Sequence, residues 1–235
     1  PERRSDDVVR RASPHAGADR LDEFPGAAHP WEAAAVGPAR PRGAEPAAGR
    51  HEGGELGVLH AAQRPAQDRE QLRAIHKGGV RALCIETMSA IDEAVCAVKA
   101  ARQVDSTFDI VVTMTFELGQ QGFRTMMGLS PEAAAKALDQ AGADIVGANC
   151  GNGMERMVEI TRQLRAATQK PILIHANAGM PQLLDGKTVF KETPADMAGY
   201  VKAIVEAGAR IVGGCCGTTP EHIAAMRKEV DKLRK

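Results

Sequence analysis

The sequence has little of several features that mark large classes of proteins. Aromatic residues make up 3% of its 235 residues, so a base-stacking platform for single-stranded nucleic acid is not expected. Basic and acidic residues balance at 30 each, which argues against a large basic surface for nucleic acid or an anionic membrane. No run of about 18 apolar residues occurs, so no transmembrane helix is predicted. We therefore expect neither a nucleic-acid partner nor a membrane partner.

Secretory features are also scarce. The N-terminus carries no apolar stretch of the signal-peptide type. The five cysteines are irregularly spaced and do not resemble the disulfide framework of a small secreted protein. They suit a reducing compartment, where thiols stay free to bind metal, so a cytoplasmic location is expected. The length fits one α/β domain of barrel size.

The first 70 residues differ in composition from the rest of the chain. Ala, Arg, Gly and Pro occupy 41 of these 70 positions, and Lys and Ile are absent from them. Such a composition does not easily bury a core, so one interpretation is disorder. The other is out-of-frame translation of a GC-rich coding sequence. We therefore divide the chain into an atypical segment over 1–70, to which we assign no chemistry, and a folded portion over 71–235.

From residue 71 onward, short runs rich in Val and Ile alternate with amphipathic stretches. The expected strands cover residues 80–86, 109–116, 143–149, 171–175 and 210–214. The helices between and after them are expected to begin near Ser89, Ser130, residue 153, Thr193 and Thr219. Five such units predict a parallel sheet, either the last strands of a (β/α)8 TIM-type barrel or a doubly wound sheet. Both folds gather their chemistry at the carboxyl ends of the strands.

A ten-residue phrase occurs twice in this region. It is AGADIVGANC at 141–150 and AGARIVGGCC at 207–216, with seven identical positions. In each copy a Gly follows an amphipathic run, an apolar stretch comes next, and a Cys ends the phrase. This order predicts a helix C-cap, a buried strand and a strand end. It puts Cys150, Cys215 and Cys216 at the carboxyl ends of two parallel strands.

If the two strands belong to one barrel, three thiols meet at its open end. Adjacent cysteines are not the CxxC spacing of a zinc ribbon, and the alternative is two small buried residues under a Gly-rich turn. Three protein ligands with a fourth position vacant describe a catalytic zinc ion. Three thiolates make such a centre a poor Lewis acid for generating hydroxide, but it can hold an incoming thiol as a reactive thiolate.

Four segments carry a resemblance to a known family. They are IET at 85–87, GANCG at 147–151, HANAGMP at 175–181 and VGGCCGTTPEHI at 212–223. They resemble the homocysteine S-methyltransferase family, and the resemblance runs from about residue 78 to 235. It implies an eight-stranded barrel of which strands four to eight are recognisable here. It also implies that Cys150, Cys215 and Cys216 bind zinc, that Glu86 holds the substrate ammonium, and that Asn177 lies beside the metal.

The implied reaction is the zinc-dependent transfer of a methyl group to the thiol of homocysteine, which gives methionine. We expect backbone N–H groups near Gly147 and Gly151 to hold the substrate carboxylate. The methyl donor stays open among a sulfonium compound, a betaine-like compound and a separate methyl-corrinoid protein.

Two alternatives to this enzyme follow from the residues. The family opens with an acidic DG-x-x-GT segment on strand one and a TNTF-like segment on strand two, and neither occurs in residues 1–70. The first alternative is therefore a truncated or frame-disrupted chain without catalysis. The second is a phosphate-binding barrel enzyme, in which Gly213, Gly214, Gly217 and the helix at Thr219 cradle a phosphate. The cysteine pair counts against this second alternative, because a phosphate cradle needs backbone amides rather than thiols.

Overall fold

The structure, a computed structural model, describes residues 56–60 and 65–233, with side chains from residue 69 onward. Its main sheet consists of β1 (Leu56–His60), β2 (Ala82–Met88), β3 (Asp109–Met114), β6 (Ile145–Asn149), β7 (Ile172–Ala176) and β10 (Ile211–Gly214). The helices of the described part are α3 (Pro65–Lys77), α4 (Ile91–Val104), α5 (Pro131–Ala141), α6 (Met154–Ala167), α7 (Pro194–Glu206) and α8 (Pro220–Leu233). Two small hairpins are formed by β4 (Glu117–Gly119) with β5 (Gly122–Arg124) and by β8 (Gln182–Leu184) with β9 (Lys187–Val189).

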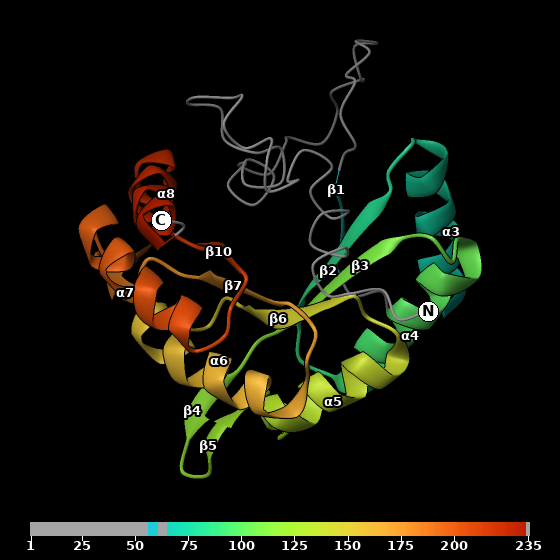
Figure 1. Cartoon of the computed structure of the whole chain (residues 1–235), viewed down its shortest axis with the longest axis horizontal. Coiled ribbons are helices and arrows are strands. Elements are labelled where there is room, and N and C mark those ends of the chain that lie inside the picture. The colour runs from blue at the N-terminus through green and yellow to red at the C-terminus, as the bar shows by residue number, and fades with distance from the viewer. Residues whose placement is uncertain (1–55, 61–64, 234–235) are drawn as a thin grey trace.

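The order of the strands decides between the two folds that the sequence left open. The sheet runs β1-β2-β3-β6-β7-β10, and every neighbouring pair is parallel. The order in space is thus the order in the chain, whereas a doubly wound sheet reverses its order at a switch point. The helices line the outer side of the curved sheet (Figure 1). This is the arrangement of a barrel-type α/β fold, and within the described residues no pairing joins β1 to β10.

Alternation along the strands separates an outer face from an inner face. Outward side chains such as Ile85, Val112 and Ile174 belong to the main core, which lies between the sheet and the helices. The intervening positions form a second, smaller cluster on the inner face: Cys84, Val111, Ile145 and Leu173, with Ile211 packed beside it. Closer to the carboxyl ends the inward positions are Glu86, Thr113 and His175, and on β6 Gly147 followed by Asn149. The inner face therefore carries an apolar layer below a polar one.

Four of the five predicted helix starts agree with the structure. The Ser130 hydroxyl accepts a hydrogen bond from the N–H of Ala133 at 3.3 Å, at the start of α5. Thr193 forms a capping box with Asp196 at the start of α7. The expected cap at Ser89 is wrong, because α4 begins after Ala90 without any side-chain cap. Helix α6 begins after Gly153, and α8 begins at Pro220, directly after Thr219.

Regular structure begins earlier than the expected boundary at residue 70. Strand β1 pairs in parallel with β2, in register from Leu56 opposite Ala82 to His60 opposite Glu86. Helix α3 begins at Pro65. The remainder of the prediction for the first segment concerns residues 1–55 and 61–64, which lie outside the described part of the chain.

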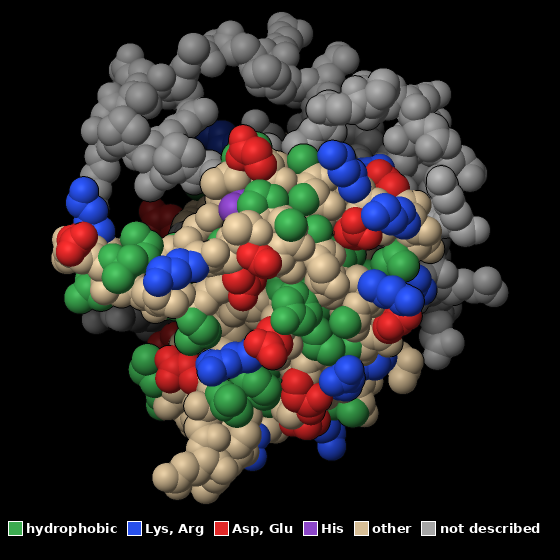
Figure 2. Space-filling model, turned by 90° about the vertical axis from the view of Figure 1, so that its left-hand side faces the viewer, with side chains coloured by type: hydrophobic (Ala, Val, Ile, Leu, Met, Phe, Trp, Pro, Cys, Tyr) green, Lys and Arg blue, Asp and Glu red, His purple; other side chains and the backbone are tan. Residues whose placement is uncertain are grey.

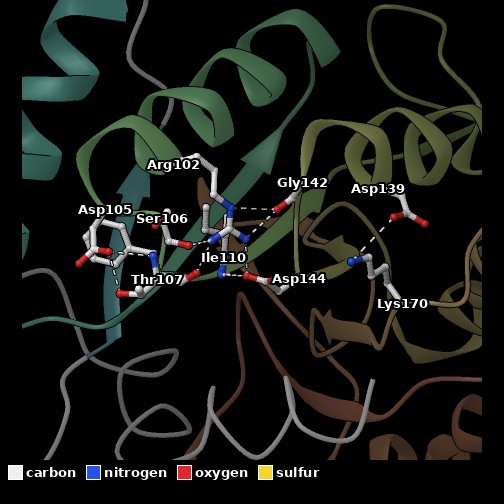
Figure 3. Close-up of polar contacts among 10 residues, drawn as sticks. Arg102, Asp105, Ser106, Thr107, Ile110, Asp139, Gly142, Asp144 and Lys170 are labelled. Carbon is white, nitrogen blue, oxygen red and sulfur yellow. Dashed lines mark hydrogen bonds and ion pairs between the residues drawn. The ribbon is translucent and has the colours of Figure 1, made fainter. Parts of the chain in front are cut away.

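Arg102 fastens helix α4 to the amino ends of two strands (Figure 3). Its Nη2 donates to Asp144 Oδ2 at 2.6 Å and to the carbonyl oxygen of Gly142 at 2.7 Å. The same Asp144 oxygen accepts the N–H of Ile110 at 2.8 Å. The ion pair is largely buried, with side-chain exposures of 24% for Arg102 and 12% for Asp144. It lies at the end of the sheet opposite to the strand ends that carry the cysteines.

The surface of the described part mixes both signs of charge. Figure 2 shows Lys and Arg side chains interspersed with Asp and Glu over one face, without a region of a single sign. Among the helices that the structure describes, none has the length and apolar character needed to cross a membrane.

Candidate metal centre

Three cysteine sulfurs converge at the carboxyl ends of β6 and β10. The Sγ atoms of Cys150 and Cys216 lie 3.7 Å apart, and those of Cys215 and Cys216 lie 4.0 Å apart. All three sulfurs lie within 4.8 Å of one another. Tetrahedral zinc with thiolate ligands at about 2.3 Å separates its sulfurs by about 3.8 Å. The donor set therefore fits one shared metal ion, and no other potential ligand group of three is this compact among the described residues.

Strand β7 lies between β6 and β10 and supports both cysteine loops. The N–H of Cys150 donates to the carbonyl oxygen of His175 at 3.1 Å, and the N–H of Cys215 donates to that of Ala176 at 2.7 Å. Cys150 has a left-handed backbone with φ of 59°. This conformation is uncommon for a residue other than glycine and turns the chain sharply at the strand end. The sulfurs are thus placed by backbone bonds to one common strand.

Asn177 connects the two cysteine loops directly. Its Oδ1 accepts the N–H of Cys216 at 3.1 Å, and its side chain also hydrogen-bonds to the Cys150 sulfur. Its own N–H donates to the carbonyl oxygen of Asn152 at 2.9 Å. The side chain is only 2% exposed. Asn177, expected beside the metal, thus contacts the Cys150 thiol and the backbone of Cys216.

The three thiols of the cluster differ in pKa. The hydrogen bond from Cys215, helped by bonds from the Gly151 N–H, Cys216 and Asn177, lowers the pKa of Cys150 to about 5 despite partial burial. The same bond to Cys150, together with burial, raises the pKa of Cys215. Burial and the charge of Cys150 raise the pKa of Cys216. At neutral pH the metal-free cluster therefore holds one thiolate and two thiols, and its single negative charge attracts a cation.

Asn149 is a residue of this site that the sequence prediction missed. Its Nδ2 lies 3.9 Å from the Cys215 sulfur and 2.7 Å from Thr87 Oγ1. Its Oδ1 accepts the N–H of Thr87 at 2.9 Å and the hydroxyl of Thr113 at 2.7 Å. The available signals were its position directly before Cys150 and its inward register on β6. In the repeat it aligns with Cys215, which drew attention to the cysteine instead.

Glu86 lies on the inner face of β2, two residues beyond Cys84. Residues two apart on a strand share a face, and burial together with the negative charge of Glu86 raises the pKa of the Cys84 thiol. Glu86 is half-buried and directly precedes Thr87, whose φ is 61°. Glu86 thus lies on the inner face near the carboxyl end of β2, and the cysteine-bearing loops also follow the carboxyl ends of their strands.

The two glycines expected to bind a carboxylate have structural reasons for being glycine. Gly147 lies inside β6, opposite Thr113 and Leu173, and a Cβ there would lie 1.9 Å from the carbonyl oxygen of Leu173. Gly151 has φ of 70°, and its N–H donates to the Cys150 sulfur. Their contact with a substrate carboxylate stays a prediction.

His175 shares the polar inner layer with Asn149, its partner in the sheet register. Burial lowers its pKa to about 4, so the imidazole is neutral. Its Nε2 has no hydrogen-bond partner among the described residues. The ring covers Gly213, where a Cβ would lie 2.7 Å from His175 Cδ2.

The glycines of the alternative phosphate cradle are covered by the protein's own side chains. A Cβ at Gly214 would lie 2.5 Å from the Thr218 side chain, and one at Gly217 would lie 2.4 Å from Phe190. The Thr218 hydroxyl donates to the carbonyl oxygen of Cys215 at 2.7 Å. The turn after β10 is therefore built around the cysteines rather than around an anion.

Comparison with known proteins agrees with this site. The sequence profile described as "Homocysteine S-methyltransferase" matches residues 17–230. The chain belongs to the homocysteine S-methyltransferase family. It is 29% identical over 160 residues to the methionine synthase of Mycobacterium tuberculosis (strain ATCC 25618 / H37Rv), a match that covers 67% of this chain and 13% of that protein. The chain thus corresponds to a small part of the methionine synthases it matches.

Solved structures of the family show the same fold. The apo form of the homocysteine methyltransferase MmuM from Escherichia coli matches with a TM-score of 0.59 and 20% identity, over 74% of this chain and 62% of that one. Its metallated form matches with a TM-score of 0.55 and 21% identity, over 71% of this chain and 52% of that one. At these identities the likeness shows the fold alone.

Proposed function

We propose that this protein transfers a methyl group to the thiol of homocysteine, giving methionine, with zinc held by Cys150, Cys215 and Cys216. The observation that carries the proposal is the convergence of the three sulfurs at the carboxyl ends of two strands. Family membership supports the same chemistry, because the family is described by this reaction.

The donor set favours thiol chemistry over hydrolysis. Three thiolate ligands leave a divalent ion with net negative charge, which suits a soft sulfur ligand and not the generation of hydroxide. Bound there, zinc would lower the pKa of the substrate thiol so that it is a thiolate at neutral pH.

The chain's own residues bind and orient the amino acid end of the substrate. Glu86 binds the ammonium by a charge-assisted hydrogen bond from the inner face of β2. Backbone N–H groups near Gly147 and Gly151 hold the carboxylate. Asn177 keeps the cysteine loops together through its bonds to Cys216 and Cys150.

The transfer is a displacement at carbon. The substrate sulfur attacks the methyl carbon in line with the leaving group, and a sulfur–carbon bond forms as the bond from the methyl group to the donor breaks. The electron pair of the broken bond departs with the donor. Holding the two partners in this alignment is the contribution of the site, because it turns a bimolecular encounter into an intramolecular one.

The test is methionine formation by the reduced, zinc-loaded chain with homocysteine and three donor classes: a sulfonium compound, a betaine-like compound and a methylcobalamin-type corrinoid. We expect methionine with one donor class and none from the Cys215→Ser variant. Cys96→Ser, which changes a cysteine of α4, is the matched control and should keep the activity. Absence of methionine with every donor, although one zinc is bound per chain, would contradict the proposal.

A further inference from the structure

Thr87 holds a backbone conformation that its side chain disfavours. Its φ of 61° lies in the left-handed region, where a β-branched residue is an outlier. The register of β2 against β3 shifts between Ile85 and Met88, so the strand is bulged at this point. The bulge returns Met88 to the outer core, where it is 1% exposed, and leaves Glu86 on the inner face. Such strained residues persist only where the surroundings hold them.

The group that holds Thr87 is the side chain of Asn149, which lies 62 residues away in the sequence. Asn149 accepts the Thr87 N–H at 2.9 Å and donates to the Thr87 hydroxyl at 2.7 Å. Because the backbone N–H can only donate, it fixes which end of the amide faces Thr87. The other contacts of the amide are the Thr113 hydroxyl and the Cys215 sulfur. All four hydrogen-bonding positions of the buried amide are thus used.

The hydrogen bonds between Thr87 and Asn149 connect the end of β2, which carries Glu86, to the end of β6, which leads to Cys150. Thr87 directly follows Glu86, and Asn149 directly precedes Cys150. Resting on the proposed function, in which Glu86 binds the ammonium and the thiol lies at the cysteines, we infer that the Thr87–Asn149 pair is a positioning device. It fixes the separation between the ammonium site and the thiol site, and so selects amino thiols by the length of their carbon chain.

The expected consequence is discrimination between homocysteine and cysteine, which is shorter by one methylene. A rigid spacing lets homocysteine reach both sites, whereas cysteine reaches only one. Loosening the end of β2 lets Glu86 move toward a shorter substrate. Zinc binding should change little in these variants, because bonds to β7 and to Asn177 hold the cysteine loops independently of Asn149.

The test measures binding of homocysteine and of cysteine to the zinc-loaded full chain by calorimetry, without a methyl donor. For Asn149→Ala, which removes both bonds to Thr87, we expect the affinity ratio of homocysteine to cysteine to fall about tenfold, the scale of one methylene in a fitted pocket. Thr87→Val removes only the hydroxyl acceptor and should lower the ratio severalfold. Thr87→Ser keeps the hydroxyl and should keep the ratio, and zinc content is measured in every variant.

Two results separate failure of this inference from failure of the proposed function. If the wild-type chain prefers homocysteine and the variants weaken both thiols by the same factor, the pair has a merely structural role and the inference is overturned. The same holds if Thr87→Ser behaves like Thr87→Val. If the wild-type chain carries one zinc and binds neither thiol, the proposed function fails and the inference fails with it.

Discussion

At the scale of single residues, the site depends on amide side chains as much as on thiols. Asn177 bonds to Cys216 and to Cys150, and Asn149 reaches Cys215. A partner that bonds to two of the cysteines, as Asn177 does, commonly changes metal affinity by about 10–100-fold when it is removed. Backbone bonds to His175 and Ala176 of β7 also hold the two cysteine loops.

Replacing Asn177 tests this directly. Asn177→Ala removes the acceptor of the Cys216 N–H and the bond to the Cys150 sulfur, so we expect zinc affinity to fall about 10–100-fold. Asn177→Asp keeps the acceptor and is expected to lose less. Competition against a chromophoric chelator measures both. An affinity of Asn177→Ala equal to that of the wild type would show that the bridge does not orient the ligands.

The ionised thiol predicts a pH dependence of the metal-free chain. The folded pKa of Cys150, about 5, lies below its ordinary value of 9.0, so the unfolded state binds one proton more between these limits. Stability should therefore rise with pH from about 5 to 9 and be lost as pH falls through 5. The raised pKa values of Cys215 and Cys216 act only above 9. The slope is at most about 1.4 kcal/mol per pH unit, and the total gain is smaller than the full pKa difference implies because Cys150 is half-exposed.

Urea unfolding of the reduced, metal-free chain at pH 7.0 and 8.5 measures this slope. This range avoids His175, whose neutral folded form gives the same sign of dependence but over lower pH. Cys150→Ser is the control and should have a flatter profile. Equal slopes for the two proteins would mean that Cys150 is not a thiolate in the folded state.

The sequence predicted the site residues that belong to motifs and missed those defined by contacts. The repeat places Cys150 and Cys216 at matching positions, which sufficed to predict that they converge. Asn149 lies in the same repeat, but the repeat does not reveal its partner Thr87, which lies 62 residues away. Register alone brings the two together, and register is known only once the strands are paired.

At the scale of elements, a largely buried ion pair between Arg102 and Asp144 lies away from the site. Arg102 bonds Asp144 and the Gly142 carbonyl and ties α4 to the start of β6. In barrels of this type, residues at the amino ends of the strands contribute to stability, whereas catalytic residues lie at the carboxyl ends.

Arg102→Ala should therefore destabilise the chain without emptying the metal site. Removing one partner of a buried ion pair leaves the other charge uncompensated, and we expect a loss of about 3 kcal/mol in the free energy of unfolding. Arg102→Lys keeps the charge but not the forked geometry, so it should lose less. Urea unfolding and zinc content are measured together. Unchanged stability in Arg102→Ala would contradict the assigned role.

Elements with a strong periodic pattern were predicted, and short ones were not. The five strands from β2 to β10 and the helices after them follow the expected order, because Val- and Ile-rich runs and caps such as Ser130 and Thr193 mark them. The two hairpins lie between the predicted elements, and their strands of three residues are too short to show alternation. Ser89 is a suitable capping residue by type, but the helix begins one residue too late for it.

At the scale of the whole molecule, one parallel sheet brings distant segments to one end. The sequence left a barrel and a doubly wound sheet open, because both consist of the same alternating units. The uninterrupted strand order decides for the barrel type. It also explains why Cys150 and Cys216, 66 residues apart, meet across a single intervening strand.

The central claim is that the described part of the chain assembles a three-thiol metal site. The most direct measurement is the zinc content of the reduced, purified chain beside its Cys215→Ser variant. We predict about one zinc per chain in the wild type and little or none in the variant, as expected for a site with three protein ligands. A wild-type chain without zinc, or a variant that keeps it, would contradict this account.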